Sequence, residues 1–240
     1  MNATHVRYEI LRTFRNRLTL GVTLALPLVV YYAIASGNRH STVSGISFPL
    51  YFMTGMAAYG AMFAAVSPGA HLALDRSRGW VRQLAITPLR ARSETIAKVL
   101  AAYVVTLPTL VVLFLAGASL GVRLDATQWL EMTGLLLVGL APFVLMGQIL
   151  GHVVPGDSLV PAVGGLVIFF ALFGGAYGAF FNSGAMLSFV KLLPSFWLVQ
   201  AGKAALVGDW PVQGWIVVAC WSTVLVPLAV VAYRRDTGGV

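Results

Sequence analysis

Charged side chains are scarce in this chain of 240 residues. Asp, Glu, Lys and Arg make up 10% of it, whereas soluble domains carry about 25%. Apolar residues make up 58%, and the mean hydropathy is +0.84. The single cysteine, Cys220, excludes a disulfide within the chain. These proportions exclude an ordinary soluble domain and predict an integral membrane protein.

Motifs of familiar catalytic chemistry are also missing. The chain has no G-x-x-x-x-G-K-[ST] sequence to cradle nucleotide phosphates, which argues against an ATPase activity of its own. Its four histidines are scattered and form no H-E-x-x-H metal motif. Gly156-Asp157-Ser158 begins like a serine-nucleophile turn, but G-x-S-x-G is not completed. We therefore expect no catalytic residue, metal or cofactor in this chain.

Ionisable residues are nearly absent from the interiors of the apolar runs. The chain therefore lacks the intramembrane acidic or basic residues that are typical of a proton-driven carrier. Gln148 is the one strongly polar side chain deep in such a run. We expect it to hydrogen-bond between helices rather than to contact a substrate. His71 and Asp75 share a face if their segment is helical, and we expect them to form a hydrated surface pair.

The apolar runs themselves predict the fold class, an all-α integral membrane protein with a single transmembrane domain over residues 1–240. About 20 apolar residues cross a bilayer. Six runs qualify, which we place at residues 18–37, 48–67, 94–120, 129–153, 159–179 and 212–233. Residues 180–210 are apolar too, but Pro194 divides them into halves too short to span. They predict a re-entrant helical hairpin that enters from the outer face.

Residues 1–17 carry four arginines, and apolar residues recur in them every four positions. This spacing is typical of an amphipathic helix lying on the membrane surface. The alternative is a plain positively charged flank of the first span. Ala33-Ile34-Ala35 also resembles a signal-peptidase site, although the long leader and the long apolar run favour a retained helix.

Basic residues predict the orientation. Residues 68–93 form the longest polar interval, and their charges are mostly positive. Such a loop resists translocation, so we place it, and with it both chain ends, on the cytoplasmic side of the plasma membrane. Of 16 Lys and Arg residues, 12 then lie inside. Because they flank apolar runs, the net charge of +8 does not indicate a nucleic-acid partner.

Small residues and prolines recur within the spans. Two G-x-x-x-G pairs occur, Gly117 with Gly121 and Gly147 with Gly151, a spacing typical of close helix contacts. Four of the spans contain a proline that predicts a kink: Pro27, Pro108, Pro142 and Pro227. Such kinks either give the helices a fixed bent shape or let them bend between two conformations.

Two stretches carry a resemblance to a known family. The loop reads Asp75-Arg76-Ser77-Arg78-Gly79-Trp80, then Leu84 and Thr87-Pro88-Leu89, with Lys98 in the next span. The hairpin reads Leu193-Pro194-Ser195-Phe196-Trp197, then Ala201-Gly202-Lys203 and Gly208. In these places the chain resembles the membrane-spanning subunit of type-2 ABC exporters of the daunorubicin or multidrug-resistance kind. That family usually has Glu-Arg-Glu before the glycine, where this chain has Asp75 and Arg78.

The resemblance implies a mechanism. Two permease copies, identical or related, would pair, and two separate ATPase subunits would dock beneath them and bind the ATP and magnesium. The segment Ala70–Leu84 would be the coupling helix that carries ATPase movement to the second and fifth spans. The residues implied in this coupling are Asp75, Arg76, Arg78, Gly79, Trp80, Leu84 and Pro88.

Those two spans are also implied to line the path of the transported molecule. Adaptable methionine and aromatic side chains suit varied apolar ligands, so we expect an apolar or amphipathic drug, antibiotic or lipid-like molecule to be exported. The candidate path residues are Met53, Met56, Tyr59, Phe63, Phe169 and Phe173. Ordinary helix packing or lipid contact is the alternative for each. Two other functions stay open: a membrane-embedded lipid-modifying enzyme and a channel that needs no ATP.

Overall fold

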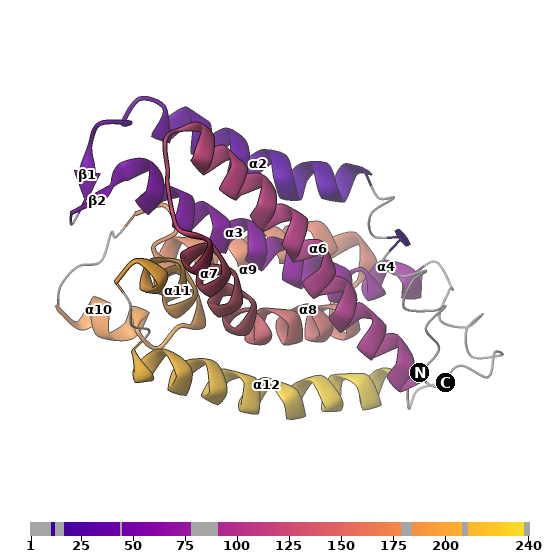
Figure 1. The fold of residues 1–240 in the computed structure, drawn as a ribbon. Helices are drawn as coiled ribbons and strands as arrows, with labels where there is room; N and C mark the ends of the chain where they lie inside the picture. The colour runs from indigo at the N-terminus through magenta and orange to yellow at the C-terminus, as the bar shows by residue number, and fades with distance from the viewer. Residues whose placement is uncertain are drawn as a thin grey trace.

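The computed structural model describes residues 11–12, 17–43, 45–77, 91–178, 184–207 and 211–237. Within these ranges the chain is a bundle of helices with one small strand pair (Figure 1). The elements are α2 Arg17–Ala35, β1 Thr42–Val43, β2 Ile46–Ser47, α3 Phe48–Ala70, α4 Leu72–Ser77, α6 Ala91–Ser119, α7 Ala126–Gly139, α8 Ala141–Val153, the 3-10 turn η1 Gly156–Ser158, α9 Leu159–Gly174, α10 Gly184–Val190, α11 Pro194–Val207 and α12 Val212–Thr237.

Five helical stretches in the described chain are long and apolar enough to cross a membrane. They are Phe48–Ser77, Ile96–Ser119, Ala126–Val153, Gly156–Gly174 and Val212–Arg235. The helices α10 and α11 together would make a sixth, but they meet at an angle of 84°. This bend is compatible with a broken span or with the expected re-entrant hairpin, which stays a prediction. In α2 the apolar stretch that could be compared with a span is Thr23–Ala35, so the expected span at residues 18–37 is described only in part and stays a prediction.

Several element boundaries differ from the expected ones; α9, for example, ends at Gly174 rather than at residue 179. The helix that begins at Phe48 does not end at Ser67 but continues through α3 and α4 to Ser77. The expected span 129–153 begins earlier, at Ala126, and is divided into α7 and α8 at Leu140. Pro142 lies in the first turn of α8, where it has no N–H to donate back to α7 and its ring crowds the preceding turn. A proline at this point explains why one helix ends and another begins.

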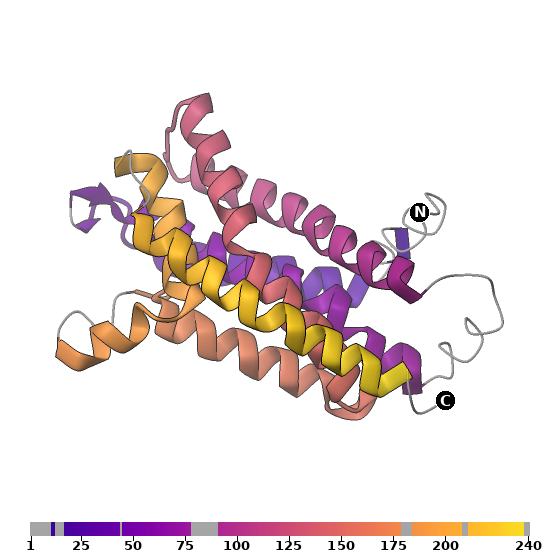
Figure 2. The ribbon, with the colours of Figure 1, turned by 90° about the horizontal axis from the view of Figure 1, so that it is seen from below.

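The core is built around α3, which lies in the middle of the bundle in both ribbon views (Figures 1 and 2). Nearly every side chain of α3 from Phe52 to Ala70 is buried, and α6, α8, α2, α9 and α11 pack on it. Six alanines and three glycines among the 23 residues of this helix let neighbouring backbones come close. By contrast α12 lies along the edge of the bundle (Figure 1) and exposes most of its apolar side chains, as expected of a helix that faces lipid.

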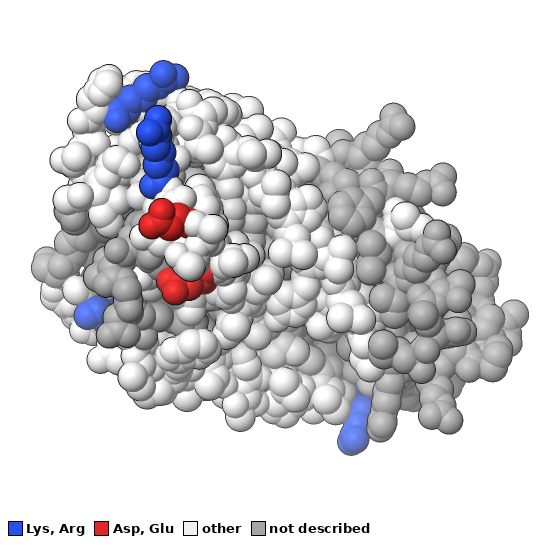
Figure 3. Space-filling view, in the orientation of Figure 1, with Lys and Arg blue, Asp and Glu red and all other residues white. Residues whose placement is uncertain are grey.

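The bundle has two distinct ends. The strands β1 and β2 lie at one of them, and Asp75 lies at the other, where α6 begins and α8 and α12 end (Figure 1). We call the second the Asp75 end. In the space-filling view the middle of the face carries no charged side chain, and those drawn in colour lie toward the two ends (Figure 3). An uncharged belt between polar ends is typical of a membrane protein.

Candidate functional site

Asp75 lies at the centre of an ionic cluster that the fold buries at the Asp75 end. Its carboxylate accepts a hydrogen bond from Lys98 Nζ at 3.2 Å and another from Arg12 Nη1 at 3.1 Å. A second Arg12 nitrogen also pairs with this carboxylate. Asp75 and Lys98 are each only 1% exposed, whereas the Arg12 side chain is 36% exposed. Burying a charge is costly unless it is paired, so the three side chains depend on one another.

The cluster joins segments that are distant in the sequence. Asp75 comes from α4, at the end of the long central helix, and Lys98 comes from α6, which begins beyond residues 78–90. Arg12 belongs to the short described piece that precedes α2. The carboxylate therefore ties together the helices that enter and leave the basic loop, and attaches the N-terminal segment to both.

Arg76, the next residue, makes contacts in another direction. Its Nη1 donates to the backbone oxygen of Gly151 at 3.1 Å and to that of His152. Both carbonyls lie in the last turn of α8, where backbone oxygens have no partner within their own helix and carry partial negative charge. Arg76 therefore caps α8 with a positive charge. Together Asp75 and Arg76 connect α4 to α6 on one side and to α8 on the other.

Glycines allow α8 to approach the central helix closely beneath this cluster. A Cβ atom on Gly147 would overlap the backbone of Val66, and one on Gly151 would overlap the carbonyl of Gly69. One expected G-x-x-x-G pair, Gly147 with Gly151, thus forms a helix contact. The other pair does not act together, because Gly117 packs on Met53 whereas Gly121 adopts a φ of +92° in a turn, a conformation that favours glycine.

The expected coupling residues fall into two groups. Asp75 and Arg76 are described and lie in the cluster. The other five lie outside the described residues: Arg78, Gly79, Trp80, Leu84 and Pro88. A role of any of them in coupling stays a prediction. The carboxylate of Asp75 is already paired within the chain, so a contribution to coupling would come from the position it gives α4.

The candidate path residues also fall into two groups, which differ in how deeply they are buried. Met53, Met56 and Tyr59 are buried in the core of the single chain. Phe63 is half-buried, and on α9 Phe169 is 44% exposed beside Phe173, with ring centroids 4.8 Å apart. In this structure the methionines pack between helices, while the α9 aromatics form part of the outer surface. Whether a transported molecule meets either group stays a prediction.

Two expectations about polar side chains are wrong. Asp75 does not form a hydrated surface pair with His71, because its side chain is buried and bound by Arg12 and Lys98. Gln148 is buried at 2% exposure, as expected, yet neither amide atom has a hydrogen-bond partner within the described part of the chain. It therefore does not link helices by hydrogen bonds.

Sequence reasoning named Asp75 and Lys98 but missed their pairing, and it missed Arg12 as the third member. The available signal was the isolated acidic residue in a basic loop, since a lone carboxylate near buried helix ends needs cations. Among the described residues no group of three or more His, Cys, Asp or Glu side chains is arranged to hold a metal ion.

Comparison with known proteins gives one informative likeness. The chain is 24% identical over 192 residues to the protein named "Putative transport permease YvfS" of Bacillus subtilis (strain 168). The match covers 78% of this chain and 78% of that protein. No protein-family model matches the chain, and no solved structure matches it.

Proposed function

We propose that this chain is the membrane-spanning permease subunit of an ATP-driven ABC exporter. The likeness to a protein named a transport permease supports a transport role, and the apolar helices supply the membrane part. The type-2 exporter assignment rests on the Asp75–Trp80 and Leu193–Trp197 sequence patterns. The permease is proposed to act as a pair of identical or related copies.

The observation that carries the proposal is the ionic cluster of Arg12, Asp75 and Lys98. An ATPase that pushes on residues 78–90 would displace α4 and α6 together, because Asp75 and Lys98 bind these helices to each other. Arg76 would pass the same displacement to α8. In this proposal α4, α6 and α8 therefore move together when an ATPase displaces the loop. Coupling to a separate ATPase subunit requires such a joint movement.

In this mechanism the chain itself binds no nucleotide. Two ATPase subunits bind ATP and magnesium, and their closure favours one of two permease conformations, since a ligand shifts an equilibrium only by binding the two states differently. The exported molecule is proposed to be apolar or amphipathic, because aromatic side chains of α9 such as Phe169 are exposed and the described chain buries no charge outside the paired cluster.

The test is co-purification from membranes of the native cell, followed by mass spectrometry and an ATPase assay. We expect a separate chain with a Walker motif to accompany the tagged protein, and the chain alone to hydrolyse no ATP. The double substitution Trp80→Asp and Leu84→Asp should abolish this association. Arg123→Asp, in a turn distant from Asp75, is the control and should leave it intact.

Two results would contradict the proposal. Undiminished association of the Trp80 and Leu84 variant would remove the coupling assignment. Ion conductance by the lone chain in a planar bilayer, with no ATPase recovered, would favour a channel instead.

A further inference from the structure

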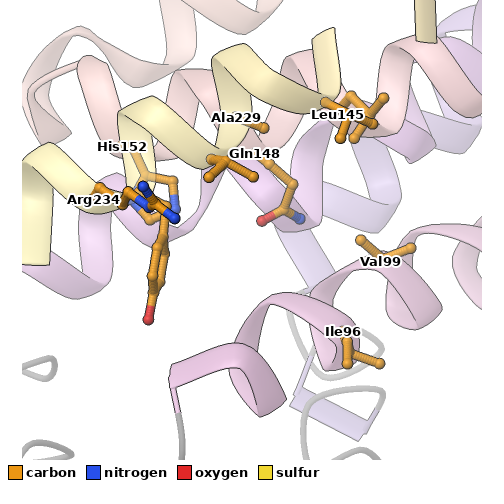
Figure 4. Close-up of a pocket in the computed structure, with 10 residues that line it drawn as sticks. Ile96, Val99, Leu145, Gln148, His152, Ala229 and Arg234 are labelled. Carbon is orange, nitrogen blue, oxygen red and sulfur yellow. The ribbon is translucent and has the colours of Figure 1, made fainter. Parts of the chain in front are cut away.

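A cavity of about 550 Å³ lies between α6, α8 and α12 at the Asp75 end (Figure 4). Its wall is mostly apolar, with Ile96 and Val99 from α6, Leu145 from α8, and Val226 and Val230 from α12. This volume falls within the range of about 300–1,000 Å³ that is usual for small-molecule sites. Because α12 is at the edge of the bundle, a molecule of the surrounding membrane could enter the cavity from the side.

Gln148 places an unsatisfied polar group in the wall of this cavity. The side chain is 2% exposed, and both its amide nitrogen and its amide oxygen lack a hydrogen-bond partner in the described part of the chain. Figure 4 shows the amide directed toward the space between α6 and α12. Buried polar groups are nearly always paired, and the terminal torsion of glutamine turns easily. In this structure both amide atoms are closed off from the cavity, so a ligand there would supply the missing partner once the amide turns toward it.

The cavity is also polar at one end and apolar at the other. His152, Tyr233 and Arg234 line it where α8 and α12 end. Gln148 lies one helical turn deeper than His152, a distance of about 6 Å along the axis, and Leu145 lies deeper still. From the rim inward the wall therefore offers a cationic group, then an uncharged hydrogen-bonding group, then hydrocarbon.

This order matches an anionic phospholipid, which has a phosphate, then ester groups, then acyl chains. Basic sites between membrane helices on the cytoplasmic side are suited to anionic head groups. We propose that the cavity binds one anionic phospholipid of the adjacent leaflet, with its phosphate at Arg234, an ester oxygen at the amide of Gln148, and an acyl chain along α6 and α12.

A second cavity provides an internal comparison. It has about 470 Å³ and lies on the other side of the α8–α12 contact, where Arg76, Val231 and Arg235 line it. It has basic residues too, yet none of the unpaired buried side-chain atoms found in the described chain belongs to its wall. Arg235 is thus adjacent to Arg234 and carries the same charge but faces a cavity that lacks the unsatisfied amide.

The binding does not require the proposed exporter function, because it can be measured on the purified chain without an ATPase. The probe is phosphatidylglycerol added to the delipidated protein in an uncharged detergent, with phosphatidylcholine and soluble glycerol phosphate as comparison ligands. The rise in Tm with phosphatidylglycerol concentration gives an apparent affinity for each variant, relative to its own Tm without lipid.

We expect phosphatidylglycerol to raise the Tm more than either comparison ligand. Gln148→Leu and Arg234→Gln should each weaken the apparent affinity roughly tenfold, the loss expected for a hydrogen bond to a charged or well-placed group. Arg235→Gln should retain the affinity. Gln148→Leu replaces an unsatisfied amide by an apolar side chain of similar size, so it should fold at least as well as the original protein.

Three outcomes would overturn the proposal. Equal responses of Arg234→Gln and Arg235→Gln would indicate general attraction of a basic surface. An unchanged affinity in Gln148→Leu would remove the amide from the site. An equal effect of glycerol phosphate would indicate an anion site with no place for an acyl chain.

Discussion

At the scale of single residues, Asp75 is the most consequential side chain in the described chain. Asp75→Asn keeps the shape of the side chain but removes the negative charge that pairs with the Lys98 ammonium, and Lys98 is only 1% exposed. Breaking a buried ion pair in this way costs about 3–5 kcal/mol. We expect a marked fall in the Tm of the purified protein, measured by loss of the monodisperse peak after heating.

The control is removal of both charges at once. Asp75→Leu combined with Lys98→Met replaces the pair by apolar groups and should recover much of the lost stability. Arg12→Ala should cost less, about 1 kcal/mol, because its side chain is more than one-third exposed. A double variant as unstable as Asp75→Asn would show that the cluster does not hold these helices as described.

The cluster also shows what the sequence can and cannot reveal about single residues. The scarcity of acidic residues made Asp75 conspicuous, and the membrane setting made every charge near a helix end informative. The partners were not predictable, because Arg12 is 63 positions away and the contact depends on how α4 and α6 are placed. Gln148 was named for the right reason, its depth, yet its missing partner could only be seen once the neighbouring helices were positioned.

At the scale of elements, close packing of α8 on α3 depends on glycine. A Cβ on Gly147 would overlap the Val66 backbone, which cannot move as a side chain does. We expect Gly147→Ala to destabilise the protein by about 1–3 kcal/mol through overpacking, seen as a lower Tm. Gly164→Ala on α9 is the matched control, because a Cβ there meets nothing within 4 Å. Equal effects of the two substitutions would argue against the close contact.

The bend between α10 and α11 is held by two tryptophans. Trp197 Nε1 donates to the backbone oxygen of Lys191 at 2.7 Å, and Trp221 Nε1 on α12 donates to that of Leu192 at 2.8 Å. Trp221→Phe removes one hydrogen bond and should cost about 1 kcal/mol. Limited proteolysis between α10 and α11 should then become faster, while Trp215→Phe, six positions earlier on α12, should leave the rate unchanged.

Helices were predictable from the sequence where their ends depend on neighbouring residues in the chain. Long apolar runs give the helical membrane fold, and that coarse expectation is confirmed. The division at Leu140 was not expected, although Pro142 was recognised as a source of a kink. A helix within Ala70–Leu84 was expected, but not that its first part, α4, would continue the span that begins at Phe48. In the sequence this segment looks like an amphipathic helix lying at the surface, but Leu72, Ala73 and Asp75 are buried against neighbouring elements.

At the scale of the whole molecule, hydropathy does not tell which span lies inside. Among the membrane-length stretches the central one, Phe48–Ser77, is the least hydropathic and the most buried. Lipid is as apolar as a leucine side chain, so the interior of a membrane bundle is selected for small, closely packing residues rather than for hydrophobicity. The alanines and glycines of α3 are therefore the better sequence signal for the centre of the bundle.

The orientation of the bundle is the prediction on which the coupling mechanism most depends. The first part of α2 and the last part of α12 lie at the same end as Asp75 (Figure 1), and the excess of Lys and Arg predicts that this end faces the cytosol. Because Cys220 is the single cysteine and is exposed, Cys220→Ser provides a background for single new cysteines. A membrane-impermeant maleimide applied to intact cells should label Arg39→Cys, near β1, and should label Arg235→Cys only after the membrane is made permeable. The reverse pattern would place residues 78–90 outside the cell, where no cytosolic ATPase can reach them, and the proposed exporter mechanism would fail while the fold and the ionic cluster remained as described.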